Sequence, residues 1–155
     1  MHIHRSEKVW LVCGVVALVV FLAIIGGAAI SDGIVPPSHI ETIDPTKVAQ
    51  TPPFDHPGLR RTGPHTMEAY VVAHIFSFTP DAMKIPVGTK VTFYATSPDV
   101  VHGFFITDTA VNMMVIPGWV SSATHTFTKR GSYLLLCNEY CGAGHQYMYG
   151  TIDVK

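Results

Sequence analysis

Residues 137–148 read Cys-Asn-Glu-Tyr-Cys-Gly-Ala-Gly-His-Gln-Tyr-Met, and they lie between two short runs with the composition of β-strands. Within this stretch, Cys137, Cys141, His145 and Met148 supply two thiols, an imidazole and a thioether. Sulfur and imidazole donors favour copper, whereas Ca²⁺ and Mg²⁺ need clustered oxygen ligands. The stretch therefore predicts a copper site on a loop between strands, where Gly142 and Gly144 let the backbone turn.

The second cysteine changes the kind of copper site that is expected. A mononuclear blue-copper site needs one thiolate, two imidazoles and a weak axial methionine. Cys137 and Cys141 are four residues apart, and two such thiolates can bridge a pair of copper ions. Each ion then needs its own imidazole: His145 is one, and His102, between two predicted strands, is the candidate for the other. A plain disulfide between the two cysteines is the alternative.

The sequence from Met67 onward predicts a mainly β domain, residues 67–155. β-branched and aromatic runs alternate with turn residues at the spacing of a small Greek-key β-sandwich. The expected strands are 69–78, 90–96, 103–107, 111–116, 124–128, 132–136 and 147–154. Alternation along the first strand puts Tyr70, Phe76 and Phe78 on one side, which is expected to pack inward.

Two further segments precede this domain. Residues 31–66 carry seven prolines, at positions 36, 37, 45, 52, 53, 57 and 64, without an apolar period, and predict an extended connector that builds no core. Residues 9–30 contain no charged side chain, and as a helix they would span about 33 Å, enough for a bilayer core. Residues 9–30 therefore predict a transmembrane helix. A cleavable signal peptide is the alternative, but the apolar run is long for one.

Charge favours one orientation and argues against one class of ligand. Arg5 and Lys8 precede the apolar segment, which places residues 1–8 in the cytoplasm and the β domain outside the cell membrane. The formal net charge is −1, and no basic field for nucleic-acid binding follows from it. We therefore expect membrane lipid, and no nucleic acid, among the partners.

The spacing Cys-x-Glu-x-Cys-x3-His-x2-Met, with an upstream Pro-Asp-x-x-His-Gly-Phe, resembles cytochrome c oxidase subunit II. The resemblance covers nearly the whole chain and implies a cupredoxin-like sandwich that carries two copper ions as the binuclear CuA centre. It implies that Cys137 and Cys141 bridge the ions. His145 and the backbone carbonyl of Glu139 would complete one copper, and His102 and Met148 the other.

The resemblance also implies partners. The CuA centre would accept electrons from cytochrome c and pass them to the haem of the catalytic subunit I, which also holds CuB. That subunit reduces oxygen to water, coupled to proton translocation. A single anchor is most like the B-type haem-copper oxidases of bacterial or archaeal inner membranes.

One departure from the family concerns docking of the electron donor. The tryptophan-rich stretch of many members is replaced here by His74-Ile75-Phe76-Ser77-Phe78. A more apolar docking mode is therefore expected. The candidate docking residues are Phe76, Phe78, Phe104 and Trp119, and Trp119 could instead pack on subunit I or cover the end of the sandwich.

Two other protein classes share part of the pattern. Membrane-tethered copper chaperones or thiol oxidoreductases of the Sco type also have Cys-x3-Cys, but on a thioredoxin-like fold with βα units after the motif. The copper domain of nitrous oxide reductase shares the ligand pattern but normally follows a large propeller. Quinol-oxidase homologues keep the fold without the copper ligands, so the intact set favours a cytochrome donor.

Overall fold

The computed structural model describes residues 4–31 and 38–155. The chain divides into two units, residues 1–34 and 35–155. Residues 1–3 of the predicted cytoplasmic segment and residues 32–37 of the predicted connector lie outside the described residues.

The N-terminal unit is one helix, α1 (Arg5–Ser31). It includes the whole predicted apolar segment and starts four residues earlier, where Glu7 in the first turn suits the positive end of the helix dipole. Its apolar side chains lie on all sides and none is buried. The helix is long and apolar enough to cross a membrane.

The second unit is built almost entirely from strands. These are β1 (Ser38–Thr42), β2 (Gly58–Gly63), β3 (Thr66–His74), β4 (Ser77–Thr79), β5 (Ala82–Ile85), β6 (Thr89–Thr96), β7 (His102–Ile106), β8 (Asn112–Val115), β9 (Trp119–Phe127), β10 (Gly131–Leu136) and β11 (Tyr149–Val154). Two 3₁₀ helices, η1 (Pro45–Gln50) and η2 (His145–Tyr147), interrupt the loops.

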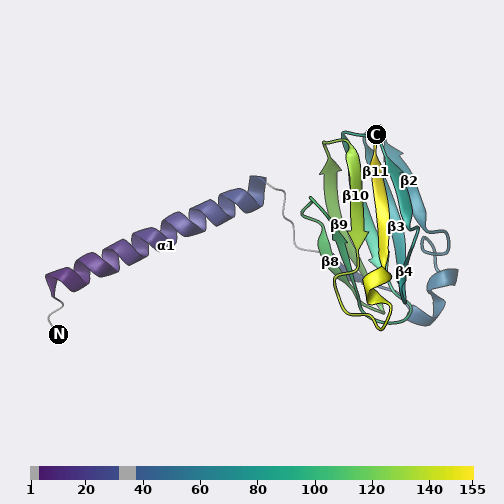
Figure 1. Cartoon of the computed structure of the whole chain (residues 1–155), viewed down its shortest axis with the longest axis horizontal. Helices are drawn as coiled ribbons and strands as arrows, with labels where there is room; N and C mark the ends of the chain where they lie inside the picture. The colour runs from purple at the N-terminus through teal and green to yellow at the C-terminus, as the bar shows by residue number, and fades with distance from the viewer. Residues whose placement is uncertain (1–3, 32–37) are drawn as a thin grey trace. The chain divides into compact units, whose positions relative to one another are not determined.

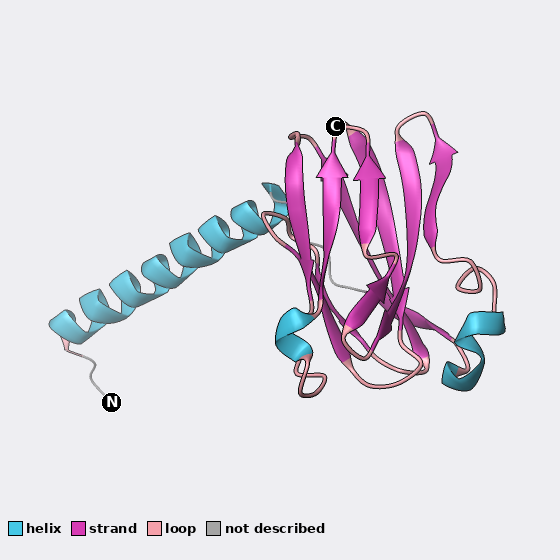
Figure 2. Ribbon diagram, turned by 45° about the vertical axis from the view of Figure 1, so that its right-hand side comes forward, coloured by secondary structure: helices cyan, strands magenta, loops and turns pink. Residues whose placement is uncertain are grey.

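The strands form two sheets that face each other (Figures 1 and 2). One sheet has the order β1-β9-β6-β3-β2, with β4 paired to β3, and the other has the order β5-β11-β10-β7-β8. The β3–β6 and β5–β11 pairs are parallel and the rest are antiparallel. The predicted all-β sandwich is therefore confirmed.

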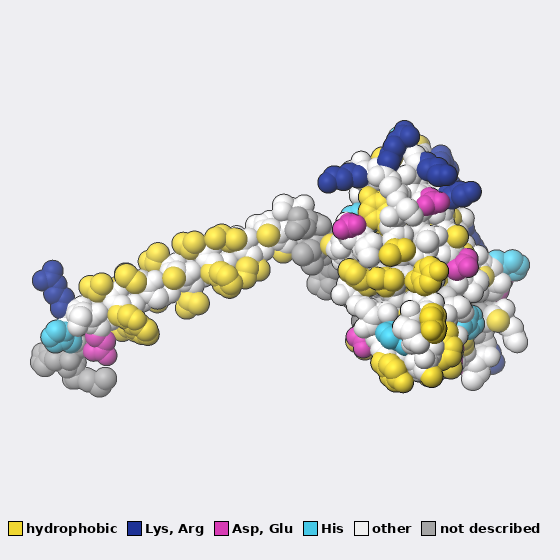
Figure 3. Space-filling view, viewed as in Figure 1, with side chains coloured by type: hydrophobic (Ala, Val, Ile, Leu, Met, Phe, Trp, Pro, Cys, Tyr) yellow, Lys and Arg dark blue, Asp and Glu magenta, His cyan; other side chains and the backbone are white. Residues whose placement is uncertain are grey.

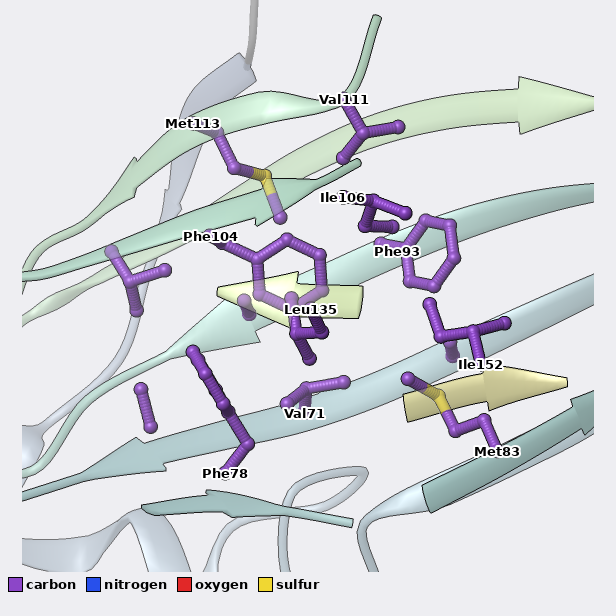
Figure 4. Packing of buried hydrophobic residues seen from close by; sticks show 14 of the residues in the cluster. Val71, Phe78, Met83, Phe93, Phe104, Ile106, Val111, Met113, Leu135 and Ile152 are labelled. Atoms are coloured by element: carbon purple, nitrogen blue, oxygen red, sulfur yellow. The ribbon is translucent and has the colours of Figure 1, made fainter. Parts of the chain in front are cut away.

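The main core fills the space between the sheets. Phe93 of β6, Phe104 of β7, Leu135 of β10 and Ile152 of β11 meet there, and all four are fully buried (Figure 4). The Phe93 and Phe104 ring centroids are 5.6 Å apart. The period-2 alternation of the strands delivers these side chains to one face of each sheet.

A second, smaller core corrects the predicted connector. Val48 and Phe54 are buried against Val72 and Val120, on the side of the β1-containing sheet that faces away from the main core. The Phe54 ring meets the Tyr70 ring edge-on at 5.7 Å. The prediction that residues 31–66 form an extended connector without a core is wrong for 38–63. Its scattered apolar residues cover one existing sheet face, so they need no period of their own.

Truncating Phe54 tests the contribution of this second core. Phe54 is 3% exposed, so Phe54→Ala should lower the free energy of unfolding by about 3–5 kcal/mol. Urea denaturation of the full chain in detergent measures it. His56→Ala is the control, because that side chain is 85% exposed. A loss below about 1 kcal/mol for Phe54→Ala, near the effect of an ordinary surface change, would contradict this packing.

The predicted strand 69–78 is also corrected, because it is broken into β3 and β4. The two strands pair antiparallel around Ile75 and Phe76, with His74 opposite Ser77. Phe76 has a φ of 70°, which no strand residue adopts. The predicted inward face is therefore only partly confirmed: Phe78 of β4 enters the main core, but from β3 it is Ala69, Val71 and Ala73 that do so. Tyr70 and Val72 of β3 face the second core instead, where Val72 is buried and Tyr70 packs against it.

Candidate metal site

The site lies at one end of the sandwich, in the loop that joins β10 to β11 (Figure 1). Cys137 follows the last residue of β10, and Met148 precedes the first residue of β11. The backbone N–H of Cys137 donates to the carbonyl of Met148 at 3.2 Å, which closes the loop at its base. The two strands therefore fix both ends of the predicted ligand loop.

Within the loop, a short turn brings the predicted ligands back toward Cys137. The N–H of His145 donates to the carbonyl of Gly142 at 3.1 Å, and the N–H of Met148 donates to the carbonyl of His145 at 3.1 Å. Gly142 has a φ of 130°, in the region that favours glycine. The predicted need for backbone freedom is thus met at Gly142.

His102 reaches the loop from the other segment, as the first residue of β7. β7 pairs with β10, with Phe105 opposite Leu136, so the start of β7 lies beside the end of β10. His102 is fully buried, and its Nδ1 lies 3.9 Å from the Cys137 Sγ. Sheet pairing therefore joins two segments that are 35 residues apart in the sequence.

The remaining donors cluster around the two sulfurs. Cys137 Sγ and Cys141 Sγ are 3.8 Å apart, and both cysteines are free. Cys141 Sγ lies 3.5 Å from Nδ1 of His145 and 3.7 Å from Sδ of Met148. The carbonyl oxygen of Glu139 lies 3.2 Å from Cys137 Sγ. All six sequence-predicted ligand residues are thus brought together, and His102, Cys137 and Cys141 form a candidate metal site.

Asp99 was not assigned a role from the sequence, although it belongs to the quoted upstream motif. Its Oδ1 lies 2.9 Å from Nε2 of His102. Partial burial alone would raise the pKa of Asp99, but hydrogen bonds from His102, Val100, Ile75 and Ser97 outweigh it and lower the pKa to about 2. An ionised Asp99 only accepts, so Nε2 of His102 donates and Nδ1 is free to bind a metal. The sequence feature that could have identified Asp99 as a partner of His102 is its position three residues before that histidine.

The electrostatics of the sulfur pair favour a bound cation. Burial raises the pKa of the Cys141 thiol, and the neighbouring Cys137 raises it further. Two adjacent buried thiols are therefore hard to ionise together without a positive charge between them. A metal ion supplies that charge and displaces the protons.

The predicted docking residues do not share one environment. Phe78 and Phe104 are 2% and 0% exposed, so the prediction that they form part of a docking surface is wrong. Both belong to the main core, where their rings meet at 5.9 Å. Phe76 and Trp119 are exposed. The burial of Phe78 instead confirms the inward side that alternation along the first strand predicts for it.

The structure also tests two alternative predictions, a disulfide between Cys137 and Cys141 and a thioredoxin-like fold. A disulfide has its sulfurs about 2.05 Å apart, and Cys137 and Cys141 are free. In a thioredoxin-like fold, βα units would follow the cysteines, but here residues 149–154 form β11, which lies between β5 and β10. Neither alternative fits the described residues.

A β-sandwich that gathers thiol, thioether and imidazole donors at one end is a cupredoxin-like metal-binding protein. The periplasmic domain of subunit II of cytochrome oxidase (CoxB) of Bradyrhizobium japonicum has the same fold. It aligns with a TM-score of 0.53 at 20% identity over 61% of this chain and 86% of that one.

Three more specific comparisons narrow the class. The family model for cytochrome C oxidase subunit II, periplasmic domain, matches residues 72–154. A cytochrome c oxidase subunit 2 of Thermus thermophilus is 42% identical over 153 residues, which cover 96% of this chain and 91% of that protein. A chain in the cryo-EM structure of a heme-copper terminal oxidase dimer aligns with a TM-score of 0.80 at 33% identity, covering 97% of this chain and 100% of that one. This chain belongs to the cytochrome c oxidase subunit II family and is part of a haem-copper oxidase complex.

Proposed function

We propose that this chain holds two copper ions as a binuclear CuA centre and relays electrons from cytochrome c to the haem of subunit I. The observation that carries the proposal is the pair of free sulfurs, 3.8 Å apart, with one imidazole beside each. A thiolate binds a metal ion at about 2.3 Å, so one ion can contact both sulfurs and leave their opposite side for a second. A mononuclear site would leave one of these thiols without a role.

The residues divide the ligand roles between two copper ions. Cys137 and Cys141 would bridge, and His145 with the Glu139 carbonyl would complete one ion. His102 with Met148 would complete the other. Sulfur, imidazole and carbonyl donors suit copper, so the donor set fits the group. When bound, the copper pair supplies one-electron redox chemistry with the electron hole shared over both ions.

The protein's own contribution is to fix these donors and exclude water. His102, Cys137, Cys141 and Met148 are buried, and the β7–β10 pairing and the closed loop base hold them in place. Ligands held in this way would move little when an electron arrives or leaves, and this favours fast electron transfer. Asp99 orients the His102 ring through the hydrogen bond at Nε2.

His145 is the imidazole that lies toward solvent, and we place the cytochrome c contact on its side of the domain. His145 is partly exposed, and the exposed Tyr140 ring lies 5.9 Å from it. Tyr147 is exposed in the same loop. Electrons would then leave toward subunit I, whose haem and CuB carry out oxygen reduction coupled to proton translocation.

We propose that α1 crosses the cell membrane once, with residues 1–8 in the cytoplasm and the copper domain on the outer side. The length and apolar surface of α1 support a span, and Arg5 and Lys8 at its start support the orientation. Membrane lipid would then surround the helix, because its side chains are apolar along the whole predicted span.

Electron paramagnetic resonance on the copper-loaded full chain tests the assignment. One unpaired electron shared over two copper nuclei gives seven hyperfine lines, and a metal analysis should find two copper ions per chain. A four-line spectrum with one copper ion would mean a mononuclear site and would overturn the proposal. Met148→Leu should shift the reduction potential while both ions remain bound.

The salt dependence of electron transfer tests the docking mode. In the view of Figure 3, most of the Lys and Arg side chains of the β domain lie at the end of the sandwich that carries the C-terminus, away from the ligand loop. We therefore expect the bimolecular rate with cytochrome c to fall far less with added salt than the roughly tenfold or greater loss of electrostatically steered partners. Stopped-flow kinetics at increasing ionic strength measure this, and a steep decline would contradict apolar docking.

A further inference from the structure

The two-residue turn between β3 and β4 has an unusual occupant. Phe76 has a φ of 70°, in the left-handed region where glycine and asparagine are common and bulky residues are rare. Two-residue hairpin turns normally place Asn or Gly at such positions. A phenylalanine here costs backbone energy on the order of 1 kcal/mol, so its side chain is expected to make up for that cost through its contacts.

The Phe76 ring lies directly against the backbone of the ligand loop. A Cβ atom at Gly144 would lie 2.7, 2.8 and 3.0 Å from three carbons of this ring. A Cβ at Gly142 would lie 3.2 Å from two further ring carbons. The two glycines therefore form a flat surface for the ring, on the segment between Cys141 and His145.

The other residue of the turn reaches the second ligand segment. The backbone N–H of Ile75 donates to Oδ2 of Asp99 at 2.7 Å. Oδ1 of the same carboxylate holds Nε2 of His102 at 2.9 Å. One hairpin turn thus contacts both pieces of the chain that carry the predicted imidazole ligands.

We propose that Phe76 is a positioning residue of the metal site, whose ring holds residues 142–144 and thereby fixes His145 relative to Cys141. This inference rests on the proposed function for its metal and assigns Phe76 a role other than docking cytochrome c.

The role of Phe76 is tested by a substitution that removes its ring and leaves the β3–β4 turn intact. Asparagine tolerates a positive φ, so Phe76→Asn keeps the hairpin and loses only the packing. In the copper-loaded full chain, we expect a chelator to remove copper about tenfold faster or more, as for other residues that support metal ligands. The hyperfine pattern should also change, because His145 is no longer held in one orientation.

Two comparison variants separate positioning from general stability. Phe76→Tyr retains the ring and should restore the wild-type release rate. Leu134→Asn is the matched control, since Leu134 is an exposed apolar residue of similar exposure, 43% against 38% for Phe76. It should leave release and spectrum unchanged even if the melting temperature falls.

A metal-free measurement keeps this inference separate from the proposed function. Alkylation of Cys141 in the full chain without copper should be several-fold faster in Phe76→Asn than in the wild type. Equal alkylation and equal copper release in the two proteins would overturn the role of Phe76. A wild-type chain that binds a single copper ion would overturn the binuclear proposal, while the alkylation rates would still decide the role of Phe76.

Discussion

Replacing Cys137 with serine is expected to abolish the paired copper centre and to lower the rate of electron transfer from cytochrome c by far more than about 100-fold. That figure is the upper end for residues that only support ligands, and Cys137 is proposed as a ligand of both ions. A serine hydroxyl does not ionise near neutral pH and cannot bridge two ions in the place of a thiolate. The seven-line spectrum should be lost together with the activity.

The chain contains its own control for this change. Cys13 is the third cysteine and lies in α1, in the other unit of the chain. Cys13→Ser should therefore leave copper content, spectrum and rate as in the wild type. A Cys137→Ser protein that still bound two copper ions with a shared electron would contradict the bridging role.

Gly103→Ala is expected to be nearly as damaging, although no atom of Gly103 is a proposed ligand. A Cβ at Gly103 would overlap the side-chain oxygen of Asn138 and lie 2.6 Å from the backbone nitrogen of Asn138 and 2.8 Å from that of Glu139. The ligand loop would have to move away from β7. We expect the free energy of unfolding to fall by about 3 kcal/mol, the upper end for an added methyl group in a packed interior.

The same change should also reduce copper affinity, because it separates His102 from Cys137. Urea denaturation and competition with a chelator measure the two effects. Gly26→Ala is the control, since a Cβ there would meet nothing within 4 Å. Unfolding and affinity both within the wild-type range for Gly103→Ala would show that the loop does not rest on this glycine.

The ligand cluster was largely predictable because its chemistry is local. Four of the predicted ligand side chains fall within the single loop 137–148, and the soft donor set restricts the metal whatever the fold. The prediction of His102 needed one further inference, namely that the second imidazole must come from another loop. Asp99 was missed because a carboxylate three residues before a histidine has many ordinary explanations until the 2.9 Å contact is known.

The elements that were predicted wrongly depend on contacts between distant segments. Phe54 and Val48 look like isolated apolar residues among prolines, and only the outer face of the sheet explains their burial. The strand 69–78 reads as continuous because Phe76 has a strand-forming side chain, yet its ring packs on a loop that comes more than sixty residues later. The prediction that Phe78 and Phe104 take part in docking was wrong because the burial of a strand residue depends on which strands become its neighbours.

The adjacency of β7 and β10 has a consequence for the order of events during biogenesis. A growing polypeptide that ends before residue 137 holds His102 but none of the sulfur donors, so it has no means of trapping the metal early. Contacts of long sequence separation form late, because the intervening chain must first be ordered. Copper capture would thus report that synthesis and folding of the outer domain are complete, and a misfolded copy would remain unloaded.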